Sequence, residues 1–440
     1  MFYSGDQSGK LSTLAFSENE NRDITMERCL LFFFVIFINS VCVGQIESVR
    51  SIQINGQEIF PVDLTSNRSS KYPDYSKVKT AIGSADIVVI SEPDHGDYSA
   101  ISNRQSLVEY LHDSCGFNAL ITEYSFFLLN AIGEDTCCID FDRFNNLTDS
   151  SYYWDYLPDL FDWVEKEREN GTPIILTGCD IHTYYYFLDF IKSRIGEINS
   201  EIANSEKFRW FYDYCLNLTE GPFRKNKKLE KSFQRYCNFL IDLFIQKDPN
   251  NICAQYLLNL NTEISNYFLS RYKSDRKTLK EMNNRDKQMA DNIIWLTEHK
   301  LRGQKIIISI SSYHAMRNIS SISSRQIRRS YPVGQYLSDY FGDRLYSIAG
   351  IGYKGRPGRT PDHLYFLCDK DSSYLEHKLY KAGYKQAFID FRSFSNQEPF
   401  NMNNIYALPH IHYAVWNEVY DGILFTDSIR PAFMVFPSKR

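Results

Sequence analysis

The sequence predicts an α/β fold, with a mostly parallel central sheet flanked by helices and a large helical insertion over the carboxyl edge of the sheet. Short apolar runs alternate with helical patterns in the first part of the chain, which is typical of parallel sheets with crossover helices. Strand signals nearly vanish between residues 183 and 300, where long amphipathic segments dominate. They return after residue 301, so the insertion interrupts one α/β core.

Composition and length are consistent with such a core. The 440 residues are 43% hydrophobic and 15% aromatic, which is ample material for a large apolar interior. We expect an upstream tail and signal peptide over 1–44, the first part of the core over 45–182, the insertion over 183–300 and the second part of the core over 301–440. The net charge of −5, with Lys and Arg spread along the chain, makes nucleic acid an unexpected partner.

The N-terminal residues indicate export. Met26-Glu27-Arg28 precedes the apolar residues 29–38, and small residues follow as far as Gly44. This order is typical of a secretory signal peptide, and the apolar run is short for a bilayer span. We therefore expect a secreted or periplasmic protein with no stable membrane span after leader removal. A lipid anchor at Cys42 stays open. None of the cysteines shows a CxxC or zinc-ligand spacing.

The elements before the insertion can be placed in order. Asn55-Gly56 between two short apolar runs predicts a hairpin with a type I′ turn. Gly116 is the expected C-cap of a helix that opens near Ser99 and runs to Cys115. The remaining predictions are helices over 75–82 and 153–170 and strands over 87–90, 119–122 and 173–177.

The rest of the chain is predicted in the same way. The insertion should contain helices over 184–195, 229–246, 254–272 and 286–299, packing over the sheet and forming part of a pocket. Its clustered aromatic residues, such as Phe211, fit a core better than a ligand platform. After it we expect a helix over 333–341 and strands over 305–310, 345–350, 364–368, 387–391 and 422–425.

Arg104 is the most informative single residue. On a helix that opens near Ser99, it shares one face with Ala100, Leu107, Val108 and Leu111. This stripe should face the core, and a guanidinium buried without partners is costly. Arg104 therefore needs carboxylates, and the nearest in sequence are Glu92 and Glu123 at the ends of two predicted strands.

Ionisable residues end four successive strands. Glu92 and His95 follow the first, Glu123 ends the next, Asp180 and His182 end the third, and His314 follows the fourth. The carboxyl ends of parallel strands meet at one edge of a sheet, where open α/β folds keep their sites. The sequence thus predicts that one imidazole, two carboxylates and the Arg104 guanidinium converge in a cleft.

Hydrolysis is the chemistry these residue types favour. His95 is the natural general base, since its ordinary pKa lies near neutral pH and adjacent carboxylates increase its basicity. Arg104 could hold the acids ionised, stabilise an oxyanion or grip an anionic substrate. The sequence contains no G-x-S-x-G motif and no cysteine in a marked motif, so water is the expected attacking group.

A metal site is the competing interpretation. Glu92, His95, Glu123 and His314 are acceptable carboxylate and imidazole ligands. The sequence lacks H-E-x-x-H, and the fixed cation of Arg104 disfavours a divalent ion nearby. We therefore expect no metal and no cofactor.

At these residues the chain resembles the erythromycin esterase family. Residues 91–96, SEPDHG, are similar to the family's G-E-x-x-H-G loop, and the spacing on to Arg104 and Glu123 also matches. Residues 285–292, RDKQMADN, resemble the R-D-x-x-M-A-x-N helix, and residues 305–318 resemble the strand that precedes H-N-x-H. Two late motifs resemble residues 333–337 and 420–427.

The resemblance implies an α/β core with a helical insertion and the hydrolysis of an ester, which in named members is the macrolide lactone. It also implies that His95 activates water and that Glu92, Arg104, Glu123 and His314 line the same site. Three positions depart from the family pattern: Ser91 replaces Gly, and Ser311 and Ser312 replace the first His and the Asn of H-N-x-H.

The sequence therefore predicts an exported hydrolase of an ester or lactone. Its expected catalytic residues are Glu92, His95, Arg104, Glu123 and His314. Ser311, which could donate a hydrogen bond, and Asp180 are expected to bind substrate. The expected partner is a small molecule, and the expected state is a monomer. A metal-dependent hydrolase and a ligand-binding protein without turnover are the alternatives, the second because of Ser311.

Overall fold

The computed structural model describes thirteen stretches of the chain, and all statements below concern them. They are residues 50–65, 71–135, 141–148, 153–183, 186–220, 227–270, 275–325, 327–364, 367, 371–395, 397–403, 405–406 and 412–436. The expected signal peptide at 26–44 lies outside the described residues. In the described part of the chain, no helix is both long enough and apolar enough to cross a membrane.

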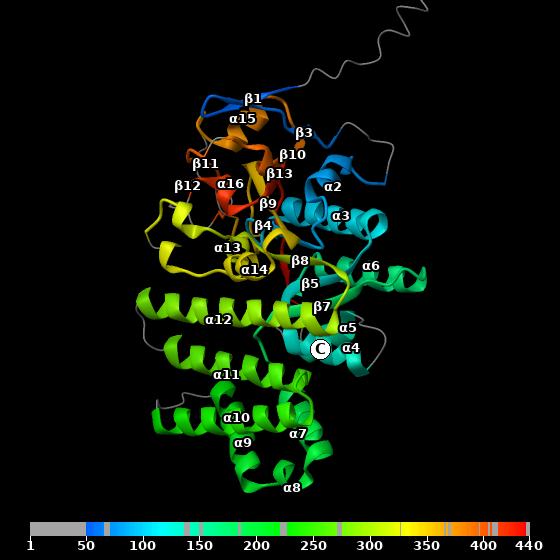
Figure 1. The fold of residues 1–440 in the computed structure, drawn as a ribbon, viewed down its shortest axis with the longest axis vertical. Helices are drawn as coiled ribbons and strands as arrows, with labels where there is room; N and C mark the ends of the chain where they lie inside the picture. The colour runs from blue at the N-terminus through cyan, green and yellow to red at the C-terminus, as the bar shows by residue number, and fades with distance from the viewer. Residues whose placement is uncertain are drawn as a thin grey trace, which may run out of the picture. The chain divides into compact units, whose positions relative to one another are not determined.

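An eight-stranded sheet forms the centre of the unit that begins at Ser51 (Figure 1). Its order is β3 (Val62–Asp63), β10 (Gln386–Asp390), β13 (Gly422–Ile429), β9 (Leu345–Gly355), β4 (Ile87–Glu92), β8 (Lys305–Ser311), β5 (Phe117–Ser125) and β7 (Ile175–Asp180). Neighbours from β13 to β7 are parallel, and only the β3–β10 and β10–β13 pairs are antiparallel. The predicted mostly parallel α/β fold is confirmed.

The middle strands are buried on both faces, as a parallel sheet requires. All six residues of β4 are buried, and so is β8 from Ile306 to Ile310. Helices α2 (Ser76–Ile82), α3 (Tyr98–Cys115), α4 (Phe126–Asp135), α5 (Phe141–Thr148) and α6 (Leu157–Glu169) accompany the first strands. The last two strands of the sheet order, β5 and β7, follow α3 and α6 directly in the chain.

Helix α3 matches the expectation closely. Leu107, Val108 and Leu111 are fully buried, and Gly116 caps the helix in the left-handed conformation with φ 74°. Asp97 caps the other end by accepting a hydrogen bond from the Ala100 backbone N–H at 3.0 Å. The stripe that carries Arg104 therefore faces the interior, as predicted.

The insertion consists of helices. They are α7 (Tyr186–Ile198), α8 (Ser200–Ala203), α9 (Glu206–Glu220), α10 (Lys227–Lys247), α11 (Ile252–Ser270), α12 (Asp275–Trp295) and the π-helix η1 (Leu296–Lys300). Of the long helices, α12 lies nearest the sheet and packs against β7, with α11 and then α10 beyond it (Figure 1). Phe211 is fully buried and stacks on Phe233 at 5.0 Å, so the aromatic cluster is core, as expected.

One predicted helix begins too early. Residues 153–156 are not helical: β6 (Tyr153–Trp154) pairs with β14 (Met434–Val435), and α6 begins at Leu157. Pro158 explains the difference, because a proline ring clashes with the carbonyl four residues earlier, here that of Trp154, if the helix extends that far back. The proline instead occupies the first turn of α6, where its missing N–H costs nothing.

The remaining elements complete the unit. The predicted hairpin is confirmed as β1 (Ile52–Ile54) and β2 (Gln57–Ile59), with positive φ at Asn55 and Gly56. The predicted strand over 364–368 falls partly outside the described residues. The others are α13 (Ser312–Ala315), α14 (Val333–Phe341), α15 (Leu375–Lys381), α16 (Trp416–Val419), β11 (Phe400–Asn401), β12 (Tyr413–Ala414) and the short turns η2 (Ile319–Ser321), η3 (Ile327–Arg329), η4 (Gly342–Arg344) and η5 (Phe391–Ser393).

Candidate active site

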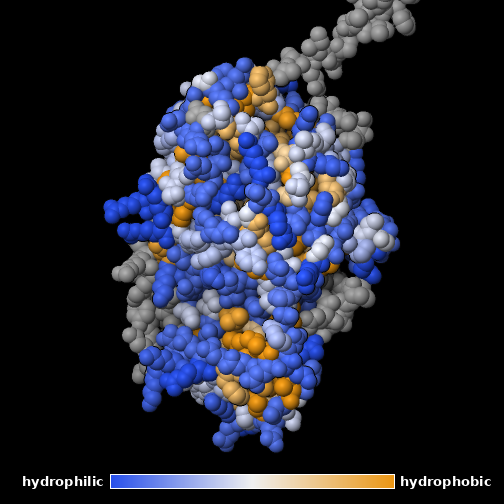
Figure 2. Space-filling view, viewed as in Figure 1, coloured by the Kyte–Doolittle hydropathy of each residue, from blue (hydrophilic) through white to orange (hydrophobic). Residues whose placement is uncertain are grey.

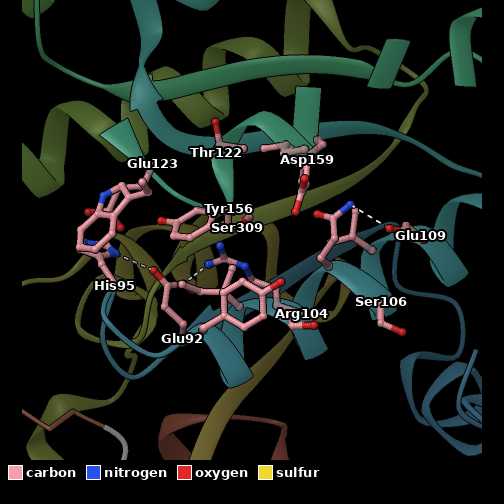
Figure 3. Close-up of a pocket in the computed structure, with 18 of the residues that line it drawn as sticks. Glu92, His95, Arg104, Ser106, Glu109, Thr122, Glu123, Tyr156, Asp159 and Ser309 are labelled. Carbon is pink, nitrogen blue, oxygen red and sulfur yellow. Dashed lines mark hydrogen bonds and ion pairs between the residues drawn. The ribbon is translucent and has the colours of Figure 1, made fainter. Parts of the chain in front are cut away.

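A cavity of about 370 Å³ opens beside the carboxyl ends of β4 and β5. Glu92, His95, Arg104 and Glu123 all line it, so the four residues expected to converge do so. Aromatic side chains, among them Tyr124, Trp154 and Tyr156, form much of the remaining wall (Figure 3). A concave pocket in which apolar walls and ionisable groups meet is a usual form of a small-molecule site.

The first part of the site, which we call the loop half, consists of Glu92, His95 and Arg104. Glu92 is the last residue of β4, and one of its oxygens, Oε1, lies 2.8 Å from His95 Nδ1. The other oxygen, Oε2, accepts a hydrogen bond from Arg104 of α3. Glu92 is 2% exposed. The buried Glu92 carboxylate is therefore the partner that the core-facing guanidinium of Arg104 was expected to need.

The loop that carries His95 is held tightly from the C-terminal side. The Gly96 carbonyl accepts hydrogen bonds from the backbone N–H groups of Gly358 and Ala432, both at 3.0 Å. A Cβ at Gly96 would lie 2.6 Å from the Gly358 carbonyl oxygen, which explains the glycine. The backbone that carries His95 is therefore fixed relative to Glu92.

His95 is placed to accept a proton from the cavity. Its side chain is 32% exposed, and Nδ1 faces Glu92 while no hydrogen bond joins Nε2 to another residue in the described stretches. Burial alone would lower the pKa of His95, but the hydrogen bond to Glu92 and the charges of Glu123, Glu92 and Asp94 outweigh it. The pKa of His95 is therefore raised.

The second part, which we call the core half, consists of Glu123, Arg285, Asp286 and His314. Glu123 and Tyr124 are consecutive residues of β5 yet both line the cavity. Side chains of a regular strand alternate between faces, but the register with β7 shifts between Thr122 and Ser125. This bulge turns both side chains toward the cavity.

Gly178 of β7 permits the bulge. A Cβ at this position would lie 2.4 Å from the carbonyl oxygen of Tyr124 and 2.5 Å from that of Ser125. No side chain could replace the glycine without moving the β5 backbone. Gly178 is thus needed for the close approach of β7 to the β5 bulge, which the sequence pattern alone does not reveal.

Glu123 is surrounded by donors. Arg285 of α12 reaches its Oε1 at 3.3 Å, His314 Nε2 lies 3.3 Å from the same oxygen, and the Ser311 backbone N–H donates to Oε2 at 2.8 Å. Burial would raise the pKa of Glu123, but His314, His95 and Arg285 hold it well below its usual range. Glu123 is therefore ionised at neutral pH.

His314 differs from His95 in every respect that matters for proton transfer. Its side chain is 8% exposed, Nδ1 is hydrogen-bonded to the fully buried Asp286, and Nε2 faces Glu123. Burial would lower its pKa, but Asp286 and Glu123 raise it to about 10. His314 is thus an imidazolium at neutral pH. It contacts Glu123 but is not one of the residues that line the cavity.

The two residues expected to bind substrate have other contacts. Asp180 accepts two hydrogen bonds from Arg285, through Nε and one terminal nitrogen, each 2.8 Å long, and it does not line the cavity. Its neighbour His182 lies between Asp180 and Glu263, which raise its pKa to about 9. Ser311 acts through its backbone N–H, and its side chain does not line the cavity. Their role in substrate binding stays a prediction.

The four proposed metal ligands are already engaged with protein groups. Both oxygens of Glu92 are bound by His95 and Arg104, and both ring nitrogens of His314 face carboxylates. Arg104 and Arg285 place two fixed cations among them, which disfavours a divalent ion. These residues therefore do not fit a metal ion as they are arranged.

One other cluster of ligand types occurs in the described residues, at His112, Asp113 and Glu167. His112 there bridges the carbonyl oxygens of Phe117 and Thr172, at 2.8 and 2.9 Å. Its ring nitrogens are thus already used to join the end of α3 to the start of β5 and to the turn before β7. The cluster lies outside the cavity and has a structural explanation.

Sequence reasoning missed Arg285 and Asp286. The two are adjacent on α12: Arg285 binds Asp180, 105 residues earlier in the chain, and Asp286 binds His314, 28 residues later. The signal was present, because both belong to the R-D-x-x-M-A-x-N-like segment, but only its resemblance was noted. Tyr156 was missed for another reason: it was placed inside a helix instead of before one.

Comparison with known proteins identifies relatives of the chain. Residues 143–429 match the family model described as erythromycin esterase. Two curated relatives are a Bacillus subtilis protein named as a candidate hydrolase, YbfO, with 22% identity over 85% of this chain and 90% of its own length, and the Escherichia coli erythromycin esterase type II, with 21% identity over 73% and 84%. The structure of an erythromycin esterase mutant in its open conformation superposes with a TM-score of 0.61 at 14% identity, covering 82% of this chain and 96% of that one.

The match to the family model spans more than half of the chain. It contains Asp180, Arg285, Asp286 and His314, whereas the loop half and Glu123 precede it. The fold is shared with the solved esterase structure. In this chain it consists of an α/β core with a helical insertion. This chain is a member of the erythromycin esterase family.

Proposed function

We propose that this chain hydrolyses an ester or lactone by attack of a water molecule that His95 activates. The observation that supports the proposal most is the asymmetry of His95: Nδ1 is oriented by Glu92, whereas Nε2 has no hydrogen-bond partner in the described stretches, and the residue lines the cavity. A base oriented in this way contributes about 10²–10⁴ to a rate. Membership of a family named for an esterase, and a relative named as a candidate hydrolase, support the reaction class.

The proposed step balances without a cofactor. A water oxygen bonds to the substrate carbonyl carbon while one water proton moves to His95 Nε2. The carbonyl π electrons move to the oxygen, which becomes an oxyanion. When the tetrahedral intermediate collapses, the bond to the leaving alcohol breaks, and His95 returns the proton to that alcohol.

Glu92 and Arg104 prepare His95 for this step. The Glu92 carboxylate fixes the ring orientation and stabilises the imidazolium that forms when His95 accepts the proton. Arg104 keeps the buried Glu92 paired, so the carboxylate stays in place. Glu123 adds a second negative charge on the same cavity, which also favours the protonated form of His95.

The natural setting is part of the same proposal. The signal-peptide-like residues 26–44 support export, so a substrate met outside the cytoplasm fits the chain best. A macrolide lactone is one candidate, because the relatives that give the family its name are erythromycin esterases.

A substrate screen tests the proposal. The purified chain is assayed on p-nitrophenyl esters, simple lactones and macrolides, with and without EDTA, and the His95→Asn protein provides the background. We expect hydrolysis of at least one class, unchanged by EDTA and absent in the variant. Ligand-induced thermal shifts without any turnover would contradict hydrolysis and favour a binding protein, and activity that EDTA abolishes would favour a metal-dependent enzyme.

A further inference from the structure

Ester hydrolysis requires a donor for the developing oxyanion as well as a base. The cationic groups that line the cavity are directed elsewhere: Arg104 binds Glu92, and Lys71 binds Asp113 at 3.0 Å. The Thr122 hydroxyl donates to the Thr177 carbonyl at 3.1 Å. Ser311, which occupies the position of a family histidine, does not line the cavity with its side chain. The remaining hydroxyl groups on the cavity wall, among them those of Tyr156 and Ser309, are the candidates for the donor.

Tyr156 occupies the middle of the cavity. Figure 3 shows its ring between Glu123 on one side and the Glu92–Arg104 pair on the other. The ring stacks on Trp154 with centroids 5.9 Å apart and an interplanar angle of 18°. Trp154 in turn faces the His95 ring at 6.0 Å. Trp154 thus contacts both the His95 ring and the Tyr156 ring on the wall of the same cavity.

The segment that carries Tyr156 is fixed by the same part of the chain that fixes the His95 loop. Trp154 pairs with Met434, and the Asp155 backbone N–H donates to the Phe433 carbonyl at 2.9 Å. Just before them in the chain, the Arg430 carbonyl accepts a hydrogen bond from the Tyr98 backbone N–H, and the Ala432 backbone N–H donates to the Gly96 carbonyl. Residues 430–434 thus hold the base and the tyrosine in one arrangement, and preorganisation of this kind is what an oxyanion donor needs.

The Tyr156 hydroxyl has a partner among the described residues. Tyr124 of the β5 bulge forms a side-chain hydrogen bond with it. A phenol hydroxyl rotates and donates one hydrogen bond, so the Tyr156 proton that is directed to Tyr124 in the free site can turn to an oxyanion that forms beside it. Burial, together with Tyr124 and Glu92, raises the pKa of Tyr156 well above its ordinary value, so the hydroxyl keeps its proton at neutral pH.

We infer that Tyr156 is a catalytic residue: its hydroxyl, which lies beside that of Tyr124, donates a hydrogen bond to the oxyanion formed during hydrolysis. The inference rests on the proposed function, because it assigns a role within that reaction.

Removal of the hydroxyl tests the inference. Tyr156→Phe keeps the ring and its stacking on Trp154, so the fold should survive, which a thermal melt checks. On the best ester from the screen we expect kcat to fall about 10²–10³-fold, as for loss of one oxyanion donor. KM and the acid limb of the pH profile should stay unchanged, because the ground state and His95 are not altered.

A second measurement is independent of turnover. A p-nitrophenyl methylphosphonate monoanion resembles the tetrahedral intermediate, so it should bind Tyr156→Phe at least about tenfold more weakly than wild type. The uncharged p-nitroacetanilide should bind both proteins equally. Tyr212→Phe, which removes a hydroxyl bonded to Asp189 in the insertion, is the matched control and should change neither quantity.

Several outcomes overturn the inference. A Tyr156→Phe enzyme with unchanged kcat, or one altered only in KM, shows that the ring is merely a wall of the pocket. Ser309 also lines the cavity, so a loss confined to Ser309→Ala assigns the donor to that hydroxyl instead. If the wild type hydrolyses nothing, the proposed function fails too; if His95 matters and Tyr156 does not, only this inference fails.

Discussion

The loop half and the core half of the site each centre on a histidine next to a carboxylate, but the two histidines are built for different tasks. His95 is 32% exposed and has one ring nitrogen bound, whereas His314 is 8% exposed and has both ring nitrogens facing carboxylates. The first can exchange a proton with a substrate. The second is held as a buried cation that keeps Glu123 and Asp286 in place.

The comparison shows that a carboxylate beside a histidine does not by itself make a base. What decides the role is how many ring nitrogens the protein occupies and whether water or substrate can reach the other one. Glu92 is the single carboxylate hydrogen-bonded to His95, and it raises the pKa of that imidazole together with the charges of Glu123 and Asp94. His314 has two and remains charged until about pH 10.

The largest effect should come from removing the two imidazoles in turn. His95→Asn should lower kcat by about 10²–10⁴ with little change in melting temperature, because the residue is part-exposed and contributes mainly to chemistry. His314→Asn should instead lower the melting temperature. Initial rates and thermal melts on the same preparations check the pair, and an active His95→Asn enzyme would contradict the assignment.

The next effect concerns the two arginines. Arg285→Met leaves Asp180 and Glu123, both largely buried, without their guanidinium and should cost about 3–5 kcal/mol of unfolding free energy. Arg104→Met should cost less stability, because Glu92 keeps its contact with His95. Urea unfolding of both variants checks the order, and the reverse order would show that the loop half is the structural one.

A smaller effect is the dependence of stability on pH. The pKa of His314 rises from 6.5 to about 10 on folding, so its contribution is fully present below pH 6.5 and is lost as the pH rises toward 10. The unfolding free energy of wild type should therefore decline over this window more steeply than that of His314→Gln. Parallel slopes for the two proteins would mean that His314 is not the charged partner.

The smallest effect is a displacement of the pH profile. Activity requires neutral His95, so kcat/KM should rise with pH through a pKa above 6.5. Glu92→Gln removes the carboxylate that raises this pKa, and the acid limb should move to lower pH. A limb that stays in place would show that Glu92 does not set the basicity of His95.

How much of this arrangement the sequence could predict depends on how local the cause is. Strand ends and helix faces follow from periodicity, so the convergence of Glu92, His95, Arg104 and Glu123 on one cavity was predictable. The pairing of Arg104 with Glu92 was predictable too, since a charge on a core-facing stripe needs a partner.

Longer-range features were not predictable in this way. The pairing of Arg285 with Asp180 depends on how α12 docks against β7, which periodicity does not encode. The bulge at Glu123 and Tyr124 depends on close approach to Gly178 of another strand. The position of Tyr156 could have been predicted, because Pro158 excludes a helix that begins at residue 153.

The surface of the insertion offers a contrast with the cavity. On the face in Figure 2 hydrophobic side chains gather over the insertion helices, and α10 carries the exposed Phe239 and Ile245. None of the described insertion residues lines the cavity. The sequence had predicted that the insertion forms part of the pocket, and for the described residues this is wrong. The insertion instead acts on the site through Arg285 and Asp286.

The most direct test of the difference between the two halves is an NMR titration of the histidine rings in isotopically labelled protein. The chain has nine histidines, and His95→Asn and His314→Gln would assign the two of interest. We predict that His95 titrates with a pKa above its ordinary value and that His314 stays doubly protonated until about pH 10. A His314 that loses its proton near neutrality, or a His95 that never does, would contradict the roles assigned here.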